Sequence, residues 1–328
     1  MATYSSKAYE LRTYVNIKVS RNHSIAYSMM TYLTAYVRYY YPKEFICAYM
    51  NNATDESDTT NAIILSRLKG VDIMPAKYGY SIGNDIVRDD VLYKGVKNVL
   101  NVSEIVGDDL YQHSQENRYN SFIEALEGIM KLPSTNKTNI ETLIKIDYFS
   151  EFGKAKKLLK LFQIYQDMQG RKQLNKDAKV LQERPGIKKL IIKKLKDGVD
   201  GYSCTPKMYK IDWLDIVRTI ENMLPDEEFS VKERIENQLS YLHYIKDEKL
   251  KRYQIGTVKF KSKYDSWCIK IGDSDFWYKN LSGKEIDRGD LILINNSSEY
   301  KDKRGRMQRN LMDIDVLNLD RRKQDKKK

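Results

Sequence analysis

The sequence predicts an α+β protein in which a mostly helical part precedes a five-stranded β-barrel. Apolar and aromatic side chains recur at helical intervals over most of residues 6–250. From Tyr253 onward the pattern changes to short alternating segments separated by turn residues, which is typical of strands. A chain of 328 residues normally divides into two or three domains, because single cores stop growing well below that size. We therefore expect more than one domain.

The first predicted helices lie in residues 6–51. Pro42 suits the first turn of the second helix, and Asn51-Asn52 lie beyond its end. A further short helix is expected over Asp58–Leu68. Two strand-like pieces then predict a small hairpin: Tyr78–Ile82 and Val91–Tyr93.

Residues 163–250 are predicted to be helical and lysine-rich. Their clearest break is Arg184–Ile187, which reads Arg-Pro-Gly-Ile and which we interpret as a turn. Four apolar residues near the end of this region follow a helical stripe: Ile235, Leu239, Leu242 and Ile245. The stripe favours a helix over an extended peptide at residues 236–242.

Five short alternating segments follow and suggest an OB-fold barrel. They are Gln254–Lys261, Ser266–Ile271, Asp275–Tyr278, Asp290–Ile294 and Leu311–Leu317. Aromatic rings and cations among them provide the stacking faces and charges that a single-stranded nucleic acid needs. The candidate residues are Lys259, Lys261, Lys263, Tyr264, Trp267, Trp277, Arg304 and Arg306. Because alternation buries about half of the rings, Trp267 and Trp277 could belong either to the core or to a stacking surface.

Charge points to a polyanionic partner. The chain holds 57 Lys and Arg against 45 Asp and Glu, a formal charge of +12. The excess is concentrated in residues 154–210, with 16 basic and 5 acidic side chains, and in the tail 321–328. Three widely separated cysteines predict reduced thiols, and no signal or membrane-spanning pattern is evident. We expect a cytoplasmic protein without a membrane partner.

The stretch from Arg21 to Tyr27 reads Arg-Asn-His-Ser-Ile-Ala-Tyr and is followed at fixed spacing by Tyr32–Tyr36 and Tyr41–Phe45. This pattern resembles the fingers of the bacterial C-family DNA polymerase III alpha subunit. Arg21 takes the place of the family's lysine, and His23 and Tyr27 match outright. The resemblance implies that Arg21, His23 and Tyr27 lie near the incoming nucleotide or the templating base. For His23, an N-cap or core position is the alternative.

Leu143–Lys154 is similar to the second hairpin of the helix-hairpin-helix module in the same family, including its turn glycine, Gly153. Such a turn directs backbone N–H groups at a phosphate. In the first hairpin the glycines are replaced by Asn101 and Ser103. Asn tolerates left-handed φ and Ser rarely does, so phosphate contact there stays open.

The helix after Gly153 and the lysines further on suit a duplex backbone. The candidate DNA-binding residues are Gly153, Lys154, Lys156, Lys157, Lys160, Lys188 and Lys189. A solvated lysine face is the alternative interpretation. In the family's terms the predicted parts are the C-terminal helices of the fingers at 1–75, a helix-hairpin-helix module at 76–162, a basic helical region at 163–250, an OB-fold at 251–320 and a basic tail at 321–328.

Catalytic chemistry is expected to lie elsewhere. In the family the carboxylates that bind Mg²⁺ belong to a palm domain N-terminal to the fingers, and no Asp-x-Asp precedes Arg21. Asp313-Ile314-Asp315 falls in the last expected strand, and we interpret its carboxylates as surface acids. No catalytic residue, metal or cofactor is therefore assigned to this chain, and Mg²⁺ is expected in a partner palm chain.

The resemblance implies the C-terminal portion of a replicative polymerase of a bacterium or phage, acting in the bacterial or infected-host cytoplasm. It would bind primer-template duplex and single strands, and would act as a nucleotidyltransferase only within a complete or split alpha subunit. Residues 236–242 match either a sliding-clamp-binding peptide or a structural helix of the family, so clamp contact stays open. The alternative function is a stand-alone DNA-binding accessory protein without a polymerase partner.

Overall fold

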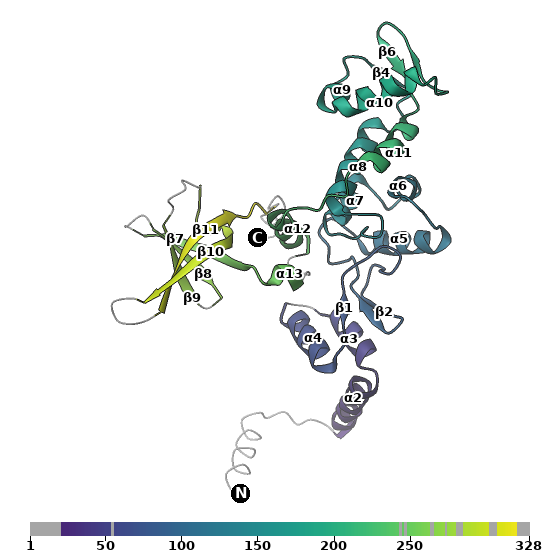
Figure 1. Ribbon diagram of the computed structural model, residues 1–328. Helices are drawn as coiled ribbons and strands as arrows, with labels where there is room; N and C mark the ends of the chain where they lie inside the picture. The colour runs from purple at the N-terminus through teal and green to yellow at the C-terminus, as the bar shows by residue number, and fades with distance from the viewer. Residues whose placement is uncertain are drawn as a thin grey trace, which may run out of the picture. The chain divides into compact units, whose positions relative to one another are not determined.

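The computed structural model describes residues 21–319, except for 54–55, 243–244, 246–247, 263–265, 273, 280–284 and 302–306 (Figure 1). The described chain forms two compact units. The first contains the residues up to Met74 together with Asp85–Tyr93, and the second contains Pro75–Asn84 and the residues from Lys94 onward. None of the described helices is both long enough and apolar enough to cross a membrane.

The first unit consists of three helices and a small sheet. Its elements are α2 (Arg21–Tyr40), α3 (Pro42–Asn51), α4 (Glu56–Lys69), β1 (Ile73–Met74), β2 (Ile86–Arg88) and β3 (Val91–Tyr93). Pro42 begins α3, as predicted, because proline lacks the N–H that the first helical turn leaves unbonded. Asn52 caps the end of the helix, but Asn51, which was expected beyond it, is its last residue. Ile46 and Leu92 are fully buried in the core between α3, α4 and the sheet.

One arm of the predicted hairpin is wrong. β3 pairs with β2 antiparallel and with β1 in parallel, whereas Tyr78–Ile82 forms a turn. The N–H groups of Tyr80 and Ser81 both donate to the carbonyl of Lys77, which closes the backbone on itself. Tyr78, which suggested a strand, instead packs in the core from this turn. It is buried, and its ring centroid lies 6.2 Å from that of Tyr148.

The helical core of the second unit surrounds α8. Its helices are α5 (Glu104–Glu116), α6 (Phe122–Ile129), α7 (Lys137–Lys145), α8 (Ala155–Met168) and α11 (Trp213–Met223). α6, α7 and α11 all contact α8. Side chains at helical spacing along α8 are buried, including Leu158, Leu161 and Phe162. The N-terminus of α6 is capped from α11, because the Glu221 carboxylate accepts from the N–H of Phe122 at 2.8 Å.

The region predicted to be wholly helical also contains a small sheet. Its strands are β4 (Gln173–Asn175), β5 (Ser203–Cys204) and β6 (Met208–Lys210), in the order β4-β6-β5. Strands this short carry too few residues for an alternating pattern to be recognised. Two helices lie between β4 and β5: α9 (Lys179–Glu183) and α10 (Pro185–Lys196). The predicted break is confirmed at Arg184, which follows α9. The interpretation of Arg184–Ile187 as a turn is wrong, because Pro185, Gly186 and Ile187 form the first turn of α10, where proline suits the first helical position.

A closed five-stranded barrel forms the C-terminal part, and it confirms the predicted α+β class (Figure 1). Its strands are β7 (Gln254–Lys261), β8 (Ser266–Ile271), β9 (Ser274–Lys279), β10 (Leu291–Lys301) and β11 (Met307–Val316). The order around the barrel is β10-β11-β9-β8-β7, with β9 and β11 parallel, which is OB-like. β10 and β11 extend beyond the predicted strands because their far ends pair with each other, as Tyr300 does with Gln308.

Residues 236–242 are helical. They lie within α12 (Val231–Leu242), and the short helix α13 (Glu248–Lys251) follows before the barrel. Ile235 of α12 is buried in a cluster with Leu250, Leu293 and Leu317. The apolar stripe in the sequence therefore identified this helix correctly.

Candidate nucleic-acid interface

The turn between α7 and α8 depends on a glycine. Gly153 has φ +140°, a region that L-residues with a side chain rarely adopt. A Cβ at this position would lie 3.0 Å from Oδ1 of Asp226. Both the backbone conformation and the close approach of Asp226 therefore require glycine. Where the resemblance predicts a first hairpin, Asn101 adopts φ +65°, while Ser103 is extended and precedes α5.

The predicted lysines of α8 share its N-terminal end with acidic side chains from beyond α11. Lys160 Nζ lies 2.7 Å from Glu227 Oε2, Lys154 Nζ lies 3.7 Å from Glu228 Oε2, and Lys156 Nζ lies 3.9 Å from Glu233 Oε2. All six side chains are between about one third and about one half exposed. The sequence alone did not indicate these pairs, because the partners are far apart along the chain.

The lysines and hydrogen bonds at this end of α8 lower the pKa of the neighbouring carboxyl groups. The hydrogen bond and the positive charge of Lys160 lower the pKa of Glu227. The pKa of Glu233 is lowered chiefly by the hydrogen bond from the backbone N–H of Ser230. Both glutamates are thus held in the ionised form that pairs with lysine. Lys157 contacts the same acidic segment through its backbone, since its N–H donates to the carbonyl of Glu227 at 3.3 Å.

The predicted lysines of α10 lie in a different environment. We define the α10 basic face as Lys188, Lys189, Lys193 and Lys196, all of which are exposed. The opposite side of the helix buries Ile187, Leu190 and Ile191. No acidic side chain of the described residues lies within ion-pair distance of these four lysines. Spacings of four and eight residues place them in two adjacent rows on one side of the helix.

On the barrel, the two tryptophans divide between surface and core. Trp277 is 41% exposed, and its ring contacts that of Phe260, which is 48% exposed, edge-on at a centroid distance of 6.0 Å. Trp267 packs against the barrel core, with the ammonium of Lys261 5.7 Å from its ring centroid. Of the two alternatives, Trp277 is therefore a surface residue and Trp267 faces the core.

Sequence reasoning missed Phe260. A register shift between Val258 and Phe260 interrupts the alternation of β7, so Phe260 lies opposite Cys268 on the same side as Trp277. Lys259, in the same irregular stretch, pairs with Asp275 at 2.7 Å. Four predicted residues, Lys263, Tyr264, Arg304 and Arg306, lie outside the described residues.

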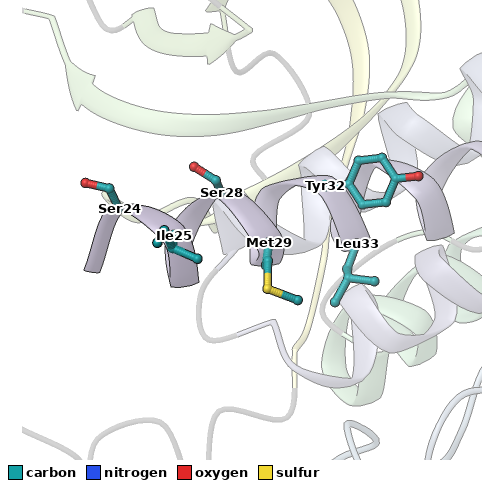
Figure 2. Close-up of a pocket in the computed structure, with 6 residues that line it drawn as sticks. All are labelled: Ser24, Ile25, Ser28, Met29, Tyr32 and Leu33. Atoms are coloured by element: carbon teal, nitrogen blue, oxygen red, sulfur yellow. The ribbon is translucent and has the colours of Figure 1, made fainter. Parts of the chain in front are cut away.

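The residues predicted to lie near a nucleotide belong to α2, in the first unit. α2 begins at Arg21, but the side chains of Arg21 and His23 lie outside the described part. Tyr27 is 69% exposed. Figure 2 shows a shallow hollow along this helix, where Ser24 and Ser28 project from a different side than Met29 and Leu33. Among the described residues, its lining comes from α2: Ser24, Ile25, Ser28, Met29, Tyr32 and Leu33.

The Asp-x-Asp of the last strand lies on β11. Asn295 donates through its Nδ2 to Asp315 at 2.8 Å and to Asp313 at 3.3 Å, so both carboxylates are on one side of the strand. Across the described residues, no group of three or more His, Cys, Asp and Glu side chains is placed to hold a metal ion.

The relatives found by comparison with known proteins include DNA polymerase III alpha subunits of several bacteria. No family model matches the chain. The DNA polymerase III subunit alpha of Thermus aquaticus is 29% identical over 154 residues, which is 45% of this chain and 12% of that protein. The alpha subunits of Mycobacterium tuberculosis and Campylobacter jejuni are 28% and 26% identical over 151 and 147 residues, or 45% and 43% of this chain.

These matches span about 12% of the length of the curated relatives. Nearly half of this chain is therefore related in sequence to a part of bacterial DNA polymerase III alpha subunits.

Proposed function

We propose that this chain binds DNA during replication as the fingers-end, helix-hairpin-helix and OB-fold portion of a polymerase related to DNA polymerase III alpha. The sequence relationship to alpha subunits carries the proposal. The polymerase palm, with its Mg²⁺-binding carboxylates, is then supplied by a separate chain. In this arrangement the chain handles template, duplex and nucleotide, and the partner performs nucleotidyl transfer.

In this proposal the lysines of α8 and α10 bind the phosphates of duplex DNA. Each lysine that neutralises a phosphate releases a condensed counterion, so the affinity falls steeply with salt. From Lys188 to Lys196, α10 rises by about 12 Å, which lets one helix side contact several successive phosphates. Such contacts fix the position of the protein on the duplex without reading its sequence.

The single-stranded template is received by the outer surface of the barrel. Trp277 offers an exposed ring for stacking on a base, and Lys259 adds a positive charge on the same side. Stacking on one aromatic side chain is worth roughly 1–3 kcal/mol per base. The unpaired strand and the duplex are thus bound by different parts of the second unit.

Arg21, His23 and Tyr27 contact the incoming nucleotide in this proposal, because a cation and a proton donor suit the charge that develops on phosphate. Contact with a sliding clamp through residues 236–242 is not part of the proposal. Gln238 and Tyr241 are buried in α12, so an extended clamp-binding peptide would require this helix to unfold.

The second candidate is a DNA-binding accessory protein without a polymerase partner. The replacement of hairpin glycines by Asn101 and Ser103 favours it, since Ser103 is extended where a phosphate-binding turn uses glycine. The two candidates share DNA binding and differ in whether this chain supports nucleotide incorporation.

The experiment is a fluorescence anisotropy titration of the purified chain with a primer-template, a matched single strand and a duplex at several salt concentrations. Tight, salt-dependent binding that prefers the primer-template supports the polymerase portion. Incorporation of nucleotides on addition of a palm-bearing chain then separates it from the accessory protein. Both candidates would be overturned if the chain bound all three DNAs with equal affinity and no more tightly than an unrelated basic protein does.

A further inference from the structure

The segment between α11 and α12 is acidic and lies against the N-terminal end of α8. We define residues 225–230 as the acidic strap; it contains Asp226, Glu227 and Glu228 and has neither helix nor strand. Its ends are fixed. Leu224 packs against the helical core, and Ser230 exchanges hydrogen bonds with Glu233 in the first turn of α12.

The acidic strap binds the backbone at the start of α8. Asp226 Oδ1 accepts from the N–H of Lys154 at 2.8 Å, and the carbonyl of Glu227 accepts from the N–H of Lys157 at 3.3 Å. These are two of the N–H groups that have no partner within the helix. The side chains of the same segment reach the lysines, as Glu227 does with Lys160 and Glu228 with Lys154.

These donors are the ones that a DNA phosphate would use. A helix N-terminus presents N–H groups and a positive dipole end, and the lysines add full charges. A carboxylate and a phosphate oxygen cannot occupy the same donors together. We propose that the acidic strap is an intramolecular competitor of the DNA backbone at α8, so that DNA engages α8 only by displacing it. This inference rests on the proposed DNA-binding function.

The strap is held weakly enough to be displaced. The side chains of Lys154 and Glu228 are 55% and 31% exposed, and those of Lys160 and Glu227 are 42% and 44% exposed. Water and salt screen ion pairs with such exposure, so each pair is weak and exchanges readily. Within the described part of the chain, no acidic segment covers the α10 basic face. DNA is therefore expected to contact α10 first, and displacement of the strap then determines whether α8 also contacts the DNA.

The test uses the full chain with the strap glutamates neutralised, Glu227→Gln with Glu228→Gln. This variant keeps Asp226 as the cap of Lys154 and therefore keeps the turn. The matched control, Asp197→Asn with Asp200→Asn, removes the same charge from exposed positions that form no ion pair with a lysine among the described residues. Anisotropy with a fluorescent duplex at 0.1 M salt should show the strap variant binding about tenfold tighter than the control, as two released ion pairs allow.

A second variant pair tests where the gain arises. Lys154→Gln with Lys160→Gln should weaken duplex binding by the unaltered chain only modestly, but should weaken binding by the strap variant by about tenfold more, because coupled sites are non-additive. A strap variant no tighter than the control, or an equal lysine effect in both backgrounds, would overturn the inference. Loss of DNA binding by every chain, including the unaltered one, would instead overturn the proposed function.

Discussion

Lys194 donates to both carboxylate oxygens of Asp215, at 3.0 and 2.8 Å, and thereby ties α10 to α11. The hydroxyl of Tyr202 adds a third hydrogen bond to the same carboxylate at 2.7 Å. Lys194 is 19% exposed, unlike the four lysines of the α10 basic face. Lys194 therefore has a structural role in α10, whereas the lysines of the α10 basic face are exposed to solvent.

Asp215→Asn should lower the free energy of unfolding by about 1 kcal/mol at pH 7, as expected for a partly exposed charged network. Burial opposes ionisation of Asp215, but hydrogen bonds from Lys194 and Tyr202 and the charge of Lys194 lower its pKa overall. A lowered pKa stabilises the fold above the unfolded value, near 4, and this stabilisation is lost as the pH falls through the folded value. The difference from the unaltered chain should thus begin to shrink as the pH falls below about 4 and should be lost below the pKa of Asp215 in the folded chain.

Urea denaturation at pH 7 and pH 3 measures this difference directly. Asp197→Asn, at the exposed C-cap of α10, is the control and should change stability by less than about 0.5 kcal/mol at either pH. If Asp215→Asn changed the stability by the same amount at both pH values, the ionisation of Asp215 would not contribute to the stability of the fold.

Replacing Lys188, Lys189 and Lys193 by Gln should weaken duplex binding about tenfold or more at 0.1 M salt. The slope of log affinity against log salt should become shallower by about 0.9 for each phosphate that the protein no longer neutralises. The matched set, Lys154, Lys156 and Lys160 replaced by Gln, should weaken binding less, because those side chains already have acidic partners. Equal weakening by the two sets would show that ion pairing does not distinguish them.

The barrel could be predicted from the sequence because short, partly alternating apolar segments are separated by turn residues. The start and end of β7 and β8 match the prediction. Val258 is buried between polar neighbours, whereas Ile269 is buried next to Cys268, which is buried as well. Alternation fails at the register shift before Phe260, and that is where an exposed ring was missed. The alternation of apolar and polar residues in the sequence does not reveal where a strand shifts register against its neighbour.

The acidic strap shows a second limit of sequence reasoning. Lys160 and Glu227 are separated by 67 residues, and only the packing of α11 on α8 brings them together. The lysine run was visible as charge, but its neutralisation depends on tertiary structure. The small sheet around β6 was missed for a related reason, since its strands gain their stability from long-range pairing instead of their own sequence.

Trp277→Ala and Phe260→Ala should each weaken binding of a single strand by roughly 1–3 kcal/mol if the exposed rings stack on bases. Both rings lie on the barrel surface, so the barrel should remain folded in either variant. Trp267→Ala is the contrasting change, because this ring packs against the core and its loss should lower barrel stability. Anisotropy with an oligothymidine and thermal unfolding separate the two effects, and unchanged binding by Trp277→Ala would exclude stacking there.

Tyr148→Phe should raise the free energy of unfolding by about 1 kcal/mol. Tyr148 is fully buried, its ring contacts Phe149 at a centroid distance of 5.1 Å, and its hydroxyl has no hydrogen-bond partner among the described residues. A buried polar group without a partner costs about 1–3 kcal/mol, and phenylalanine keeps the ring while removing that cost.

Tyr119→Phe is the matched control for this last change. The hydroxyl of Tyr119 lies 2.9 Å from Nε2 of His113, so its removal breaks a hydrogen bond and should lower stability by about 1 kcal/mol. Chemical denaturation followed by circular dichroism gives both values under one set of conditions. Opposite signs for the two variants are expected, because the same atom is deleted from a paired and an unpaired site. A loss of stability in Tyr148→Phe would mean that its hydroxyl is bonded in solution, for example by a buried water molecule.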